Sequence, residues 1–325
     1  MLSLEPLEPE RVDWARFDAF DDRVIFQTRE WLQFVSRTQG TRPVFATVRQ
    51  GGEDVGLFSA QLVRRYGIPI LASPFPGWTT ASMGFNLHDG VSRREAVEAL
   101  VQFAFRRQRC LHLELKDRHL TEEEIAGLGF DCTRDDTMEV DLTGDDEAVM
   151  SRMTSACRRA IRKAAKTGVC VEEVSGEEFA PEYYDQLLEV FGRQGLRPSY
   201  GVDRVRELVR CVGPTGRLLT VRARSPEGAP IATGIFPAMN GTAYFWGGAS
   251  RADGQIHRPN EAIFWYAMRY WRDRGIAVMD LGGGGDYKRK YGPREFTVPF
   301  FRRSRVPALG ALRDVAERVL TRGRR

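Results

Sequence analysis

The chain has 325 residues, of which 42% are hydrophobic and 28% charged, and its formal net charge is only +4. This length predicts two domains, and the ordinary composition of a globular protein excludes a disordered or fibrous chain. The small net charge excludes a strong whole-molecule field, so only the local distribution of charge bears on partners. The N-terminus is acidic, and no stretch approaches the roughly 20 apolar residues that span a bilayer. We therefore expect a cytoplasmic protein.

The cysteine and histidine patterns indicate neither a disulfide framework nor a metal site. The five cysteines form no CxxC pair, and an odd, scattered set is typical of free thiols. His112 and Glu114 share one face of an expected strand, but no further ligands accompany them, so we expect no metal. The sequence also lacks Gly-x-Ser-x-Gly, HExxH and P-loop motifs.

The first part of the chain mixes helices and strands. Helical patterns lie within 13–40 and over 92–107, where Ser92 and Glu95 suggest a capping box. Strands are expected over 43–48, 55–63, 68–71, 110–115 and 137–142. A short helix follows Thr121, which is a good N-cap residue. This order predicts one complete α/β domain that ends near Leu142.

A loop rich in Pro, Gly and small residues interrupts this domain. Its sequence, ASPFPGWTTASMGFN, starts at Ala72 and contains Trp78. Trp78 is either a peripheral core residue or the wall of a groove. We favour the groove wall, because an aromatic loop residue beside small ones suits a flat ligand.

A helix expected over 150–167 carries charge on one side only. At about 100° per residue, one arc of roughly 100° contains Arg152, Arg159, Arg162, Lys163 and Lys166. A solvated helix face normally mixes signs through i,i+4 ion pairs, whereas no acid lies between Ser151 and Lys166. We therefore expect this face to bind an anion, such as a tRNA backbone, a nucleotide diphosphate or a sugar phosphate.

The second half of the chain predicts another α/β arrangement. Helices are expected over 182–194, 202–212 and 260–274, and strands over 169–174, 217–223, 230–239, 242–247 and 276–281. Pro259 suits the first turn of the third helix, because its missing N–H would be unpaired there anyway. The last strand–helix–strand unit has the size of a βαβ crossover, which predicts a covered sheet.

Four consecutive glycines, 282–285, follow the last strand and lead into Asp286–Tyr291. Such a run is tolerable where the backbone turns tightly or where a ligand approaches it closely. The alternative is a flexible turn followed by a solvated cluster of charges.

Three segments together resemble one family. MDLGGGGDYKRKYG, from Met279, resembles the strand-then-FKxxFG signature of the Fem family of aminoacyl-tRNA-dependent peptide-bridge transferases, and of the wider Fem-like group in the GNAT acyltransferase superfamily. SACRRAIRKAAKTGVCVEE, from Ser155, resembles the family's KxRxxIRKAxKxGV segment. SPFPGW, from Ser73, lies where the family has a Pro/Gly-rich turn that lines its substrate groove. Tyr287 stands in place of the family's Phe, and the long helical hairpin of some members is absent.

The resemblance implies an α/β fold with two GNAT-like domains in tandem, each a mixed central sheet flanked by helices. The first is expected over 1–142 and the second over 143–305. A terminal helix over 306–323, amphipathic in its pattern, is expected to return to the first domain.

The resemblance also implies the site. Lys288 takes the role of the fixed cation that stabilises the tetrahedral oxyanion of acyl transfer; its alternative is a surface lysine. No general base is evident, although Asp280 and Asp286 lie nearby in sequence. Substrate-binding roles are expected for Arg37, Trp78, Arg159, Arg162, Lys163, Tyr200, Trp246, Lys290 and Tyr291. For Trp246 the alternative is a place in the core.

Two acyl donors compete. Conventional GNAT enzymes hold the pyrophosphate of coenzyme A in backbone N–H groups of a Gly-rich loop. The corresponding segment, SRADGQIHRPN, has one glycine, and its Pro259 lacks an N–H donor. We therefore favour aminoacyl-tRNA as co-substrate, with no tightly bound cofactor. The acceptor would be an amine of a cell-wall precursor, small peptide or metabolite, nucleotide-linked ones included. An acyl-CoA-dependent N-acetyltransferase of polysaccharide or secondary metabolism is the alternative. A catalytically silent RNA- or nucleotide-binding protein is a third hypothesis.

Overall fold

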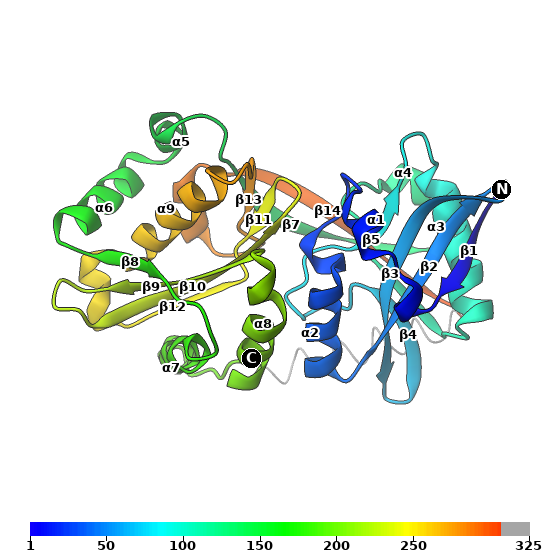
Figure 1. Ribbon diagram of the computed structural model, residues 1–325, viewed down its shortest axis with the longest axis horizontal. Coiled ribbons are helices and arrows are strands. Elements are labelled where there is room, and N and C mark those ends of the chain that lie inside the picture. The colour runs from blue at the N-terminus through cyan, green and yellow to red at the C-terminus, as the bar shows by residue number, and fades with distance from the viewer. Residues whose placement is uncertain (307–325) are drawn as a thin grey trace. The chain divides into compact units, whose positions relative to one another are not determined.

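The computed structural model describes residues 1–306, so the terminal helix expected over 306–323 falls almost wholly outside the described residues. Contacts divide the described chain into two compact units (Figure 1). Among the described residues, the first contains Met1–Asp135 and 298–306, and the second contains Asp136–Thr297. The division falls inside β7 (Asp131–Asp141) and inside β14 (Arg294–Ser304). The chain therefore passes between its units within strands, whereas the sequence placed the boundary after residue 142.

The first unit is built on a mixed sheet in which the order is β1-β2-β3-β4-β6-β14, with β5 beside β3. Its strands other than β14 are β1 (Leu2–Leu7), β2 (Arg42–Gln50), β3 (Glu53–Arg65), β4 (Ile68–Ser73), β5 (Gly84–Leu87) and β6 (His112–Leu115). Neighbours pair antiparallel except β4 and β6, which are parallel.

Helices cover both faces of this sheet (Figure 1). They are α1 (Trp14–Asp18), α2 (Arg29–Gln39), α3 (Arg93–Gln102) and α4 (Glu122–Ile125), with the short helical turns η1 (Pro9–Arg11), η2 (Ile25–Gln27) and η3 (Phe103–Arg107). α2 lies on the face opposite α3 (Figure 1), and the Gln61 side chain on β3 donates to the Leu32 carbonyl of α2 at 3.2 Å. The Ser92 hydroxyl caps α3, as the sequence predicts. Thr121 and Glu124 form a reciprocal capping box at α4.

The second unit has a mixed sheet in the order β7-β13-β11-β10-β9-β8, with β12 beside β10. Its further strands are β8 (Cys170–Glu173), β9 (Leu218–Arg224), β10 (Pro230–Met239), β11 (Thr242–Tyr244), β12 (Gly247–Ser250) and β13 (Val278–Asp280). β11 and β13 are parallel, joined by the crossover through α9 that the sequence predicts. The other pairs are antiparallel.

Helices flank this second sheet on both faces as well. They are α5 (Asp146–Arg152), α6 (Ser155–Lys166), α7 (Phe179–Gly192), α8 (Val202–Val212) and α9 (Pro259–Arg272), with the helical turns η4 (Gly213–Thr215), η5 (Asp253–His257) and η6 (Asp286–Tyr291). Figure 1 shows α6 and α9 on one face and α7 and α8 on the other. Phe236, Phe264, Trp271, Met279 and Tyr291 form part of the core beneath α9. The prediction of a mixed sheet flanked by helices in each of two units is confirmed.

One predicted helix is wrong in its bounds. The expected helix over 150–167 is two helices, because α5 ends at Arg152 and α6 begins at Ser155. The Thr154 hydroxyl accepts a hydrogen bond from the Cys157 N–H at 3.2 Å and caps α6. Arg152 therefore belongs to another helix, and its guanidinium pairs with Asp141 at 3.3 Å.

Three strands were not predicted at all: β1, β5 and β14. Over residues 1–306, the structure shows no helix that combines the length and the apolar character needed to cross a bilayer.

Candidate functional site

The strand expected over 242–247 is broken by a β-bulge. Ala243 lies opposite Ala238, while Gly247 lies opposite Ile235, so one strand advances four residues while its partner advances three. At the bulge the Phe245 N–H donates to the Asp280 carbonyl at 2.8 Å, and the next N–H turns back to β10. The pairing of β11 with β13 ends here, next to the point where the glycine run begins.

The glycine run is a tight turn whose conformation requires glycine. Gly282, Gly284 and Gly285 have φ values of 70°, 71° and 81°, a region that residues with a Cβ adopt at a cost. Gly283 has ordinary φ, but a Cβ there would lie 2.3 Å from the carbonyl oxygen of Asp136. The close approach that the sequence suggested is thus made by the protein's own backbone.

Gly283→Ala is therefore expected to lower the free energy of unfolding by about 1–3 kcal/mol, because the added methyl group overpacks against a backbone carbonyl. Urea unfolding of the purified variant measures this. Gly192→Ala is the matched control, because a Cβ at Gly192 meets nothing within 4 Å. This second change at the end of α7 should leave stability unchanged or slightly higher. Equal stability of the two variants would contradict the tight packing of the turn.

Lys288 is buried on this turn. It lies on η6 with 7% of its surface exposed, which excludes the alternative of a surface lysine. Its Nζ donates to the carbonyl oxygens of Gly283 at 2.9 Å and Gly282 at 3.4 Å, and it lies 5.9 Å from the ring centre of Phe245 at the bulge. Burial lowers the pKa of the ammonium, and the nearby carboxylate of Asp280 opposes that shift.

Lys290 and Tyr291 follow on η6 but are held inside the second unit. The Lys290 ammonium pairs with the Glu261 carboxylate of α9 at 2.7 Å. The Tyr291 ring is fully buried and stacks on Phe264 at 4.7 Å between ring centres. Burial raises the pKa of this phenol well above its usual range. These contacts anchor the segment that carries Lys288, so the predicted phosphate or groove contacts of both residues remain predictions.

Tyr200 and Trp246 are brought together in the second unit, where Trp246 is buried, as its alternative place in the core predicts, and its substrate-binding role remains a prediction. Their ring centres lie 5.7 Å apart. The guanidinium of Arg204, on α8, lies 5.3 Å from the ring centre of Tyr200. The Tyr183 and Tyr200 hydroxyls are hydrogen-bonded at 3.1 Å. Because Trp246 is in the bulge, this aromatic pair lies one residue along the chain from Phe245, which contacts Lys288. The sequence did not single out Arg204 or Tyr183.

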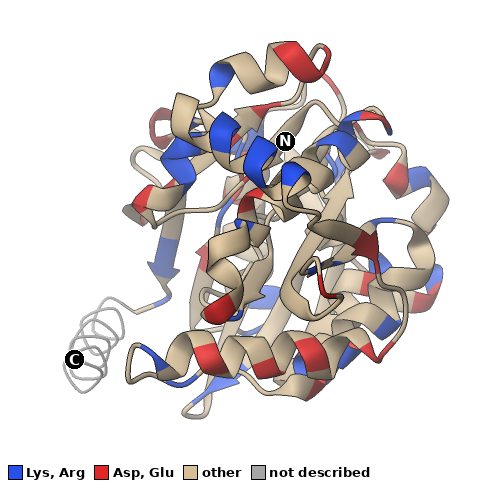
Figure 2. Ribbon diagram, turned by 90° about the vertical axis from the view of Figure 1, so that its left-hand side faces the viewer, with Lys and Arg blue, Asp and Glu red and all other residues tan. Residues whose placement is uncertain are grey.

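The cationic face survives on α6. Arg159, Arg162, Lys163 and Lys166 are all exposed, and none forms an ion pair within the part of the chain that the structure describes. Figure 2, seen from the side that α6 occupies in Figure 1, shows blue residues succeeding one another along this helix. Arg158 differs, because its guanidinium folds back onto the Met153 carbonyl at 2.5 Å. We call the four exposed residues the α6 cationic face.

The loop before α9 is occupied by a carboxylate. The Ala252 N–H donates to Glu189 of α7 at 2.8 Å, and this bond lowers the pKa of the Glu189 carboxyl. Arg251 also pairs with Glu189, at 3.1 Å. Glu261 adds a second carboxylate in the first turn of α9. Acidic groups at the start of this helix oppose an anionic ligand there.

Two predicted site residues belong to the first unit. Arg37 is exposed in the last turn of α2. Trp78 is half-buried and packs on Phe75 at 4.7 Å between ring centres, beside a small cluster that contains Ile70. This is the packing expected of a peripheral core residue, and the role of Trp78 in a groove remains a prediction.

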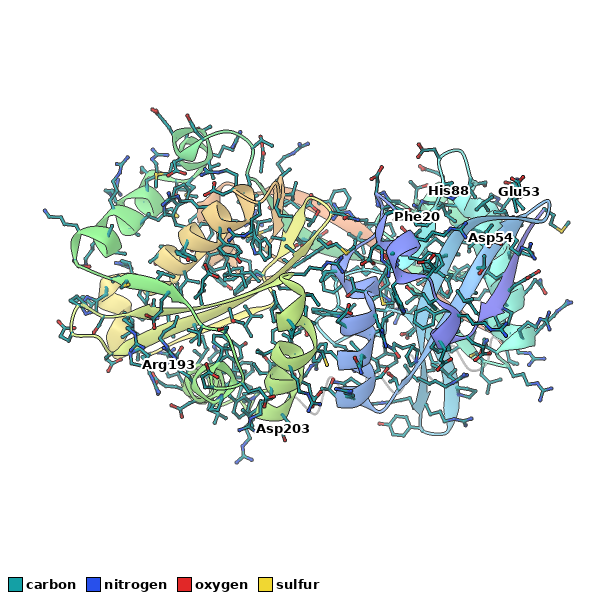
Figure 3. All side chains as sticks on the ribbon, viewed as in Figure 1. Phe20, Glu53, Asp54, His88, Arg193 and Asp203 are labelled. Atoms are coloured by element: carbon teal, nitrogen blue, oxygen red, sulfur yellow. The ribbon has the colours of Figure 1, made fainter. Side chains whose placement is uncertain are left out.

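The first unit also contains a cavity of about 690 Å³ that the sequence did not suggest. Phe20 and His88 line it and stack at 4.8 Å between ring centres (Figure 3). Arg93 at its wall joins Asp22 at 2.5 Å and Asp117 at 2.7 Å. These two ion pairs join α3 to two loops, which gives Arg93 a structural role.

Comparisons with known proteins support the fold described above. A family model described as the acetyltransferase (GNAT) domain matches residues 151–291. Among solved structures, the chain is similar to FemX, with a TM-score of 0.74 and 14% identity over 91% of this chain and 96% of that chain. It is also similar to a tandem GNAT protein from the clavulanic acid biosynthesis pathway, with a TM-score of 0.57 and 14% identity over 94% and 98% of the two chains.

A third similar structure is the C-terminal domain of a putative lysylphosphatidylglycerol synthetase from Agrobacterium fabrum, with a TM-score of 0.56 and 14% identity over 92% and 96% of the two chains. No curated protein matches the chain in sequence. At identities this low, the structural similarity shows the fold, while the family model places the GNAT signature in the second unit. Residues 151–291 therefore match a GNAT acetyltransferase domain, and the fold of the chain is similar to that of FemX and of a tandem GNAT protein.

Proposed function

We propose that this acyltransferase moves an aminoacyl group from aminoacyl-tRNA to an amine. The α6 cationic face is the observation that carries the proposal. Exposed cations without ion pairs repel one another on one helix, and a polyanion relieves that repulsion. A tRNA backbone supplies phosphates along the length of a helix, which suits four cations spread over Arg159–Lys166 better than a single diphosphate does.

The start of α9 supports the same donor. A coenzyme A pyrophosphate needs free N–H groups at a helix start, but here Ala252 N–H is taken by Glu189 and Pro259 has none. The Ala252 N–H is therefore not available to a pyrophosphate while Glu189 accepts from it. The FemX similarity adds support at the level of fold alone.

In this proposal Lys288 stabilises the oxyanion. The acceptor amine attacks the ester carbonyl of the aminoacyl group, and a C–N bond forms as the carbonyl oxygen becomes negative. Two of the three ammonium protons of Lys288 are directed to Gly282 and Gly283, so the third is available to that oxygen. The C–O bond to the tRNA ribose then breaks. The ribose oxygen takes up a proton as it leaves. This proton comes directly from the amine, or from water that accepts the amine proton in exchange.

The acceptor belongs to the class of small amines that carry a flat or polar group. Tyr200 and Trp246 form an aromatic pair one residue along the chain from the Lys288 contact, and aromatic faces hold flat groups well. An amine of a cell-wall precursor, a short peptide or a metabolite fits, including one linked to a nucleotide.

A transfer assay tests the proposal. Purified protein is mixed with a small-molecule extract of its host and either labelled amino acids on tRNA or labelled acetyl-CoA. We expect label to move from tRNA into a small product, and to stop moving when RNase is added beforehand. Transfer only from acetyl-CoA would support the alternative, which the description of the matching family model favours. Binding of tRNA with no transfer from either donor would support the silent binding protein.

A further inference from the structure

We propose that Asp280, together with Thr137 behind it, positions Lys288: its carboxylate anchors the turn whose carbonyls hold the ammonium, and it keeps a negative charge beside that buried cation. The inference rests on the proposed role of Lys288 in acyl transfer. It concerns a residue that has no contact with substrate, so Asp280 is a positioning residue and not a catalytic one.

The contacts of Asp280 form a short chain that ends at Lys288. Asp280 is the last residue of β13 and is 6% exposed. Its Oδ1 accepts a hydrogen bond from the Gly282 N–H at 2.7 Å and another from the Thr137 hydroxyl on β7. The carbonyl of the same Gly282 accepts from Lys288 Nζ. One carboxylate oxygen therefore fixes the glycine that in turn fixes the lysine.

The charge of Asp280 has its own effect. A buried ammonium without an acid nearby tends to lose its proton, and carbonyl oxygens are the only direct acceptors that Lys288 has among the described residues. The other groups beside the ammonium are the rings of Phe245 and Tyr287, each 5.9 Å away. Asp280 is the acid that acts on it, and it favours the charged form.

The sequence composition makes a direct test feasible. The chain has only five lysines, at positions 116, 163, 166, 288 and 290. Protein labelled with ¹³C at the lysine ε carbon therefore gives few signals, and Lys288→Arg assigns the one of interest. Its titration reports the pKa of Lys288 without any need for activity.

Asp280→Asn removes the charge and keeps an oxygen acceptor. We expect the pKa of Lys288 to fall, so that its ε-carbon titration moves to lower pH while that of Lys290 stays. The alkaline fall in kcat should move to lower pH by the same amount, because the ammonium is the active form, and KM should change little. Asp286→Asn is the matched control. It also removes a carboxylate close in sequence to Lys288, but the Asp286 side chain is exposed to solvent. This control variant should leave the Lys288 titration unchanged.

Thr137→Val tests the orientation of the Asp280 carboxylate separately from its charge. It removes one hydrogen bond to the carboxylate and keeps the negative charge. We expect the Lys288 ε-carbon signal to shift at neutral pH, with kcat reduced several-fold and KM unchanged. This variant also carries the test if Asp280→Asn does not fold.

An unchanged Lys288 titration in Asp280→Asn, or an unchanged Lys288 signal in Thr137→Val, would overturn the inference. A changed titration in a protein that transfers no acyl group from any donor would leave the inference standing and would reject the proposed function. The two failures are thereby distinguishable.

Discussion

Lys288→Met is expected to lower kcat for acyl transfer by about 10²–10³-fold and to change KM little, because a fixed oxyanion donor acts mainly in the transition state. Methionine keeps most of the length and bulk of the side chain, so the buried site between the glycine turn and Phe245 stays filled. Steady-state kinetics with the donor identified in the transfer assay measure the effect.

The pH dependence supplies a second measurement on the same residue. In the proposed mechanism the ammonium of Lys288 stabilises the oxyanion, and burial lowers the pKa of this group. Activity should therefore be full below that pKa and should be lost as the pH rises through it. The loss should come at lower pH than an ordinary exposed lysine would produce. Lys288→Met should lack this alkaline limb.

Arg289→Met is the control for Lys288→Met. Arg289 is the next residue on η6, is exposed, and pairs with Glu295 and Asp286. Its loss should leave kcat within about twofold of the unchanged protein, since surface substitutions of this kind have small effects. An equal loss of kcat in both variants would contradict a specific role for the Lys288 ammonium and would indicate a general disturbance of η6.

Neutralising two residues of the α6 cationic face, as Arg159→Gln with Lys163→Gln, is expected to weaken tRNA binding about tenfold at moderate salt. Each lost phosphate contact should also reduce the slope of log affinity against log salt by about one. The slope should thus fall by about two in the double variant. Filter binding or fluorescence anisotropy over a range of salt concentrations measures both quantities.

A matched pair of arginines on α8 provides the control. Arg206 and Arg210 each form an ion pair within that helix, with Asp203 at 2.7 Å and with Glu207. Arg206→Gln with Arg210→Gln removes the same charge from cations that are already neutralised. Affinity and salt slope should stay close to those of the unchanged protein. If the two double variants weaken tRNA equally, binding depends on net charge alone, and α6 is no specific surface.

Local patterns in the sequence predicted much of the second unit. α8 was predicted over the residues it occupies, because an apolar stripe and bounding glycines mark both its ends. β10 was predicted equally well from a long apolar run between turns. The break between α5 and α6 was missed because no Gly or Pro marks it, although Thr154 is a good N-cap residue.

The missed strand β14 shows a different limit. Phe296, Val298 and Phe300 alternate with other residues as a strand should. A proline within a run, such as Pro299 here, disfavours a central strand. Pairing with β6, in which Phe301 lies opposite Leu115, decides the conformation. That partner lies far away along the chain, so no local window contains the information.

The site residues named from the sequence remain predictions, and their contacts were not predictable from the sequence. The glycine run stands out by composition, whereas Lys288 was assigned from the resemblance of its segment to the Fem-family signature. The burial of Lys288 depends on carbonyls that only the folded turn presents. Likewise, Lys290 meets Glu261 because η6 packs near the start of α9, and sequence spacing does not reveal such a contact.

The passage of the chain through β7 and β14 has a consequence for synthesis on the ribosome. β14 is a member of the sheet of the first unit, where Ser304 lies opposite His112. Residues 1–135 therefore leave the ribosome without one of their strands, and most of the second unit emerges before that strand does. The N-terminal unit is thus the later of the two to close. Until then, β6 presents an open edge of the kind that attracts other strands.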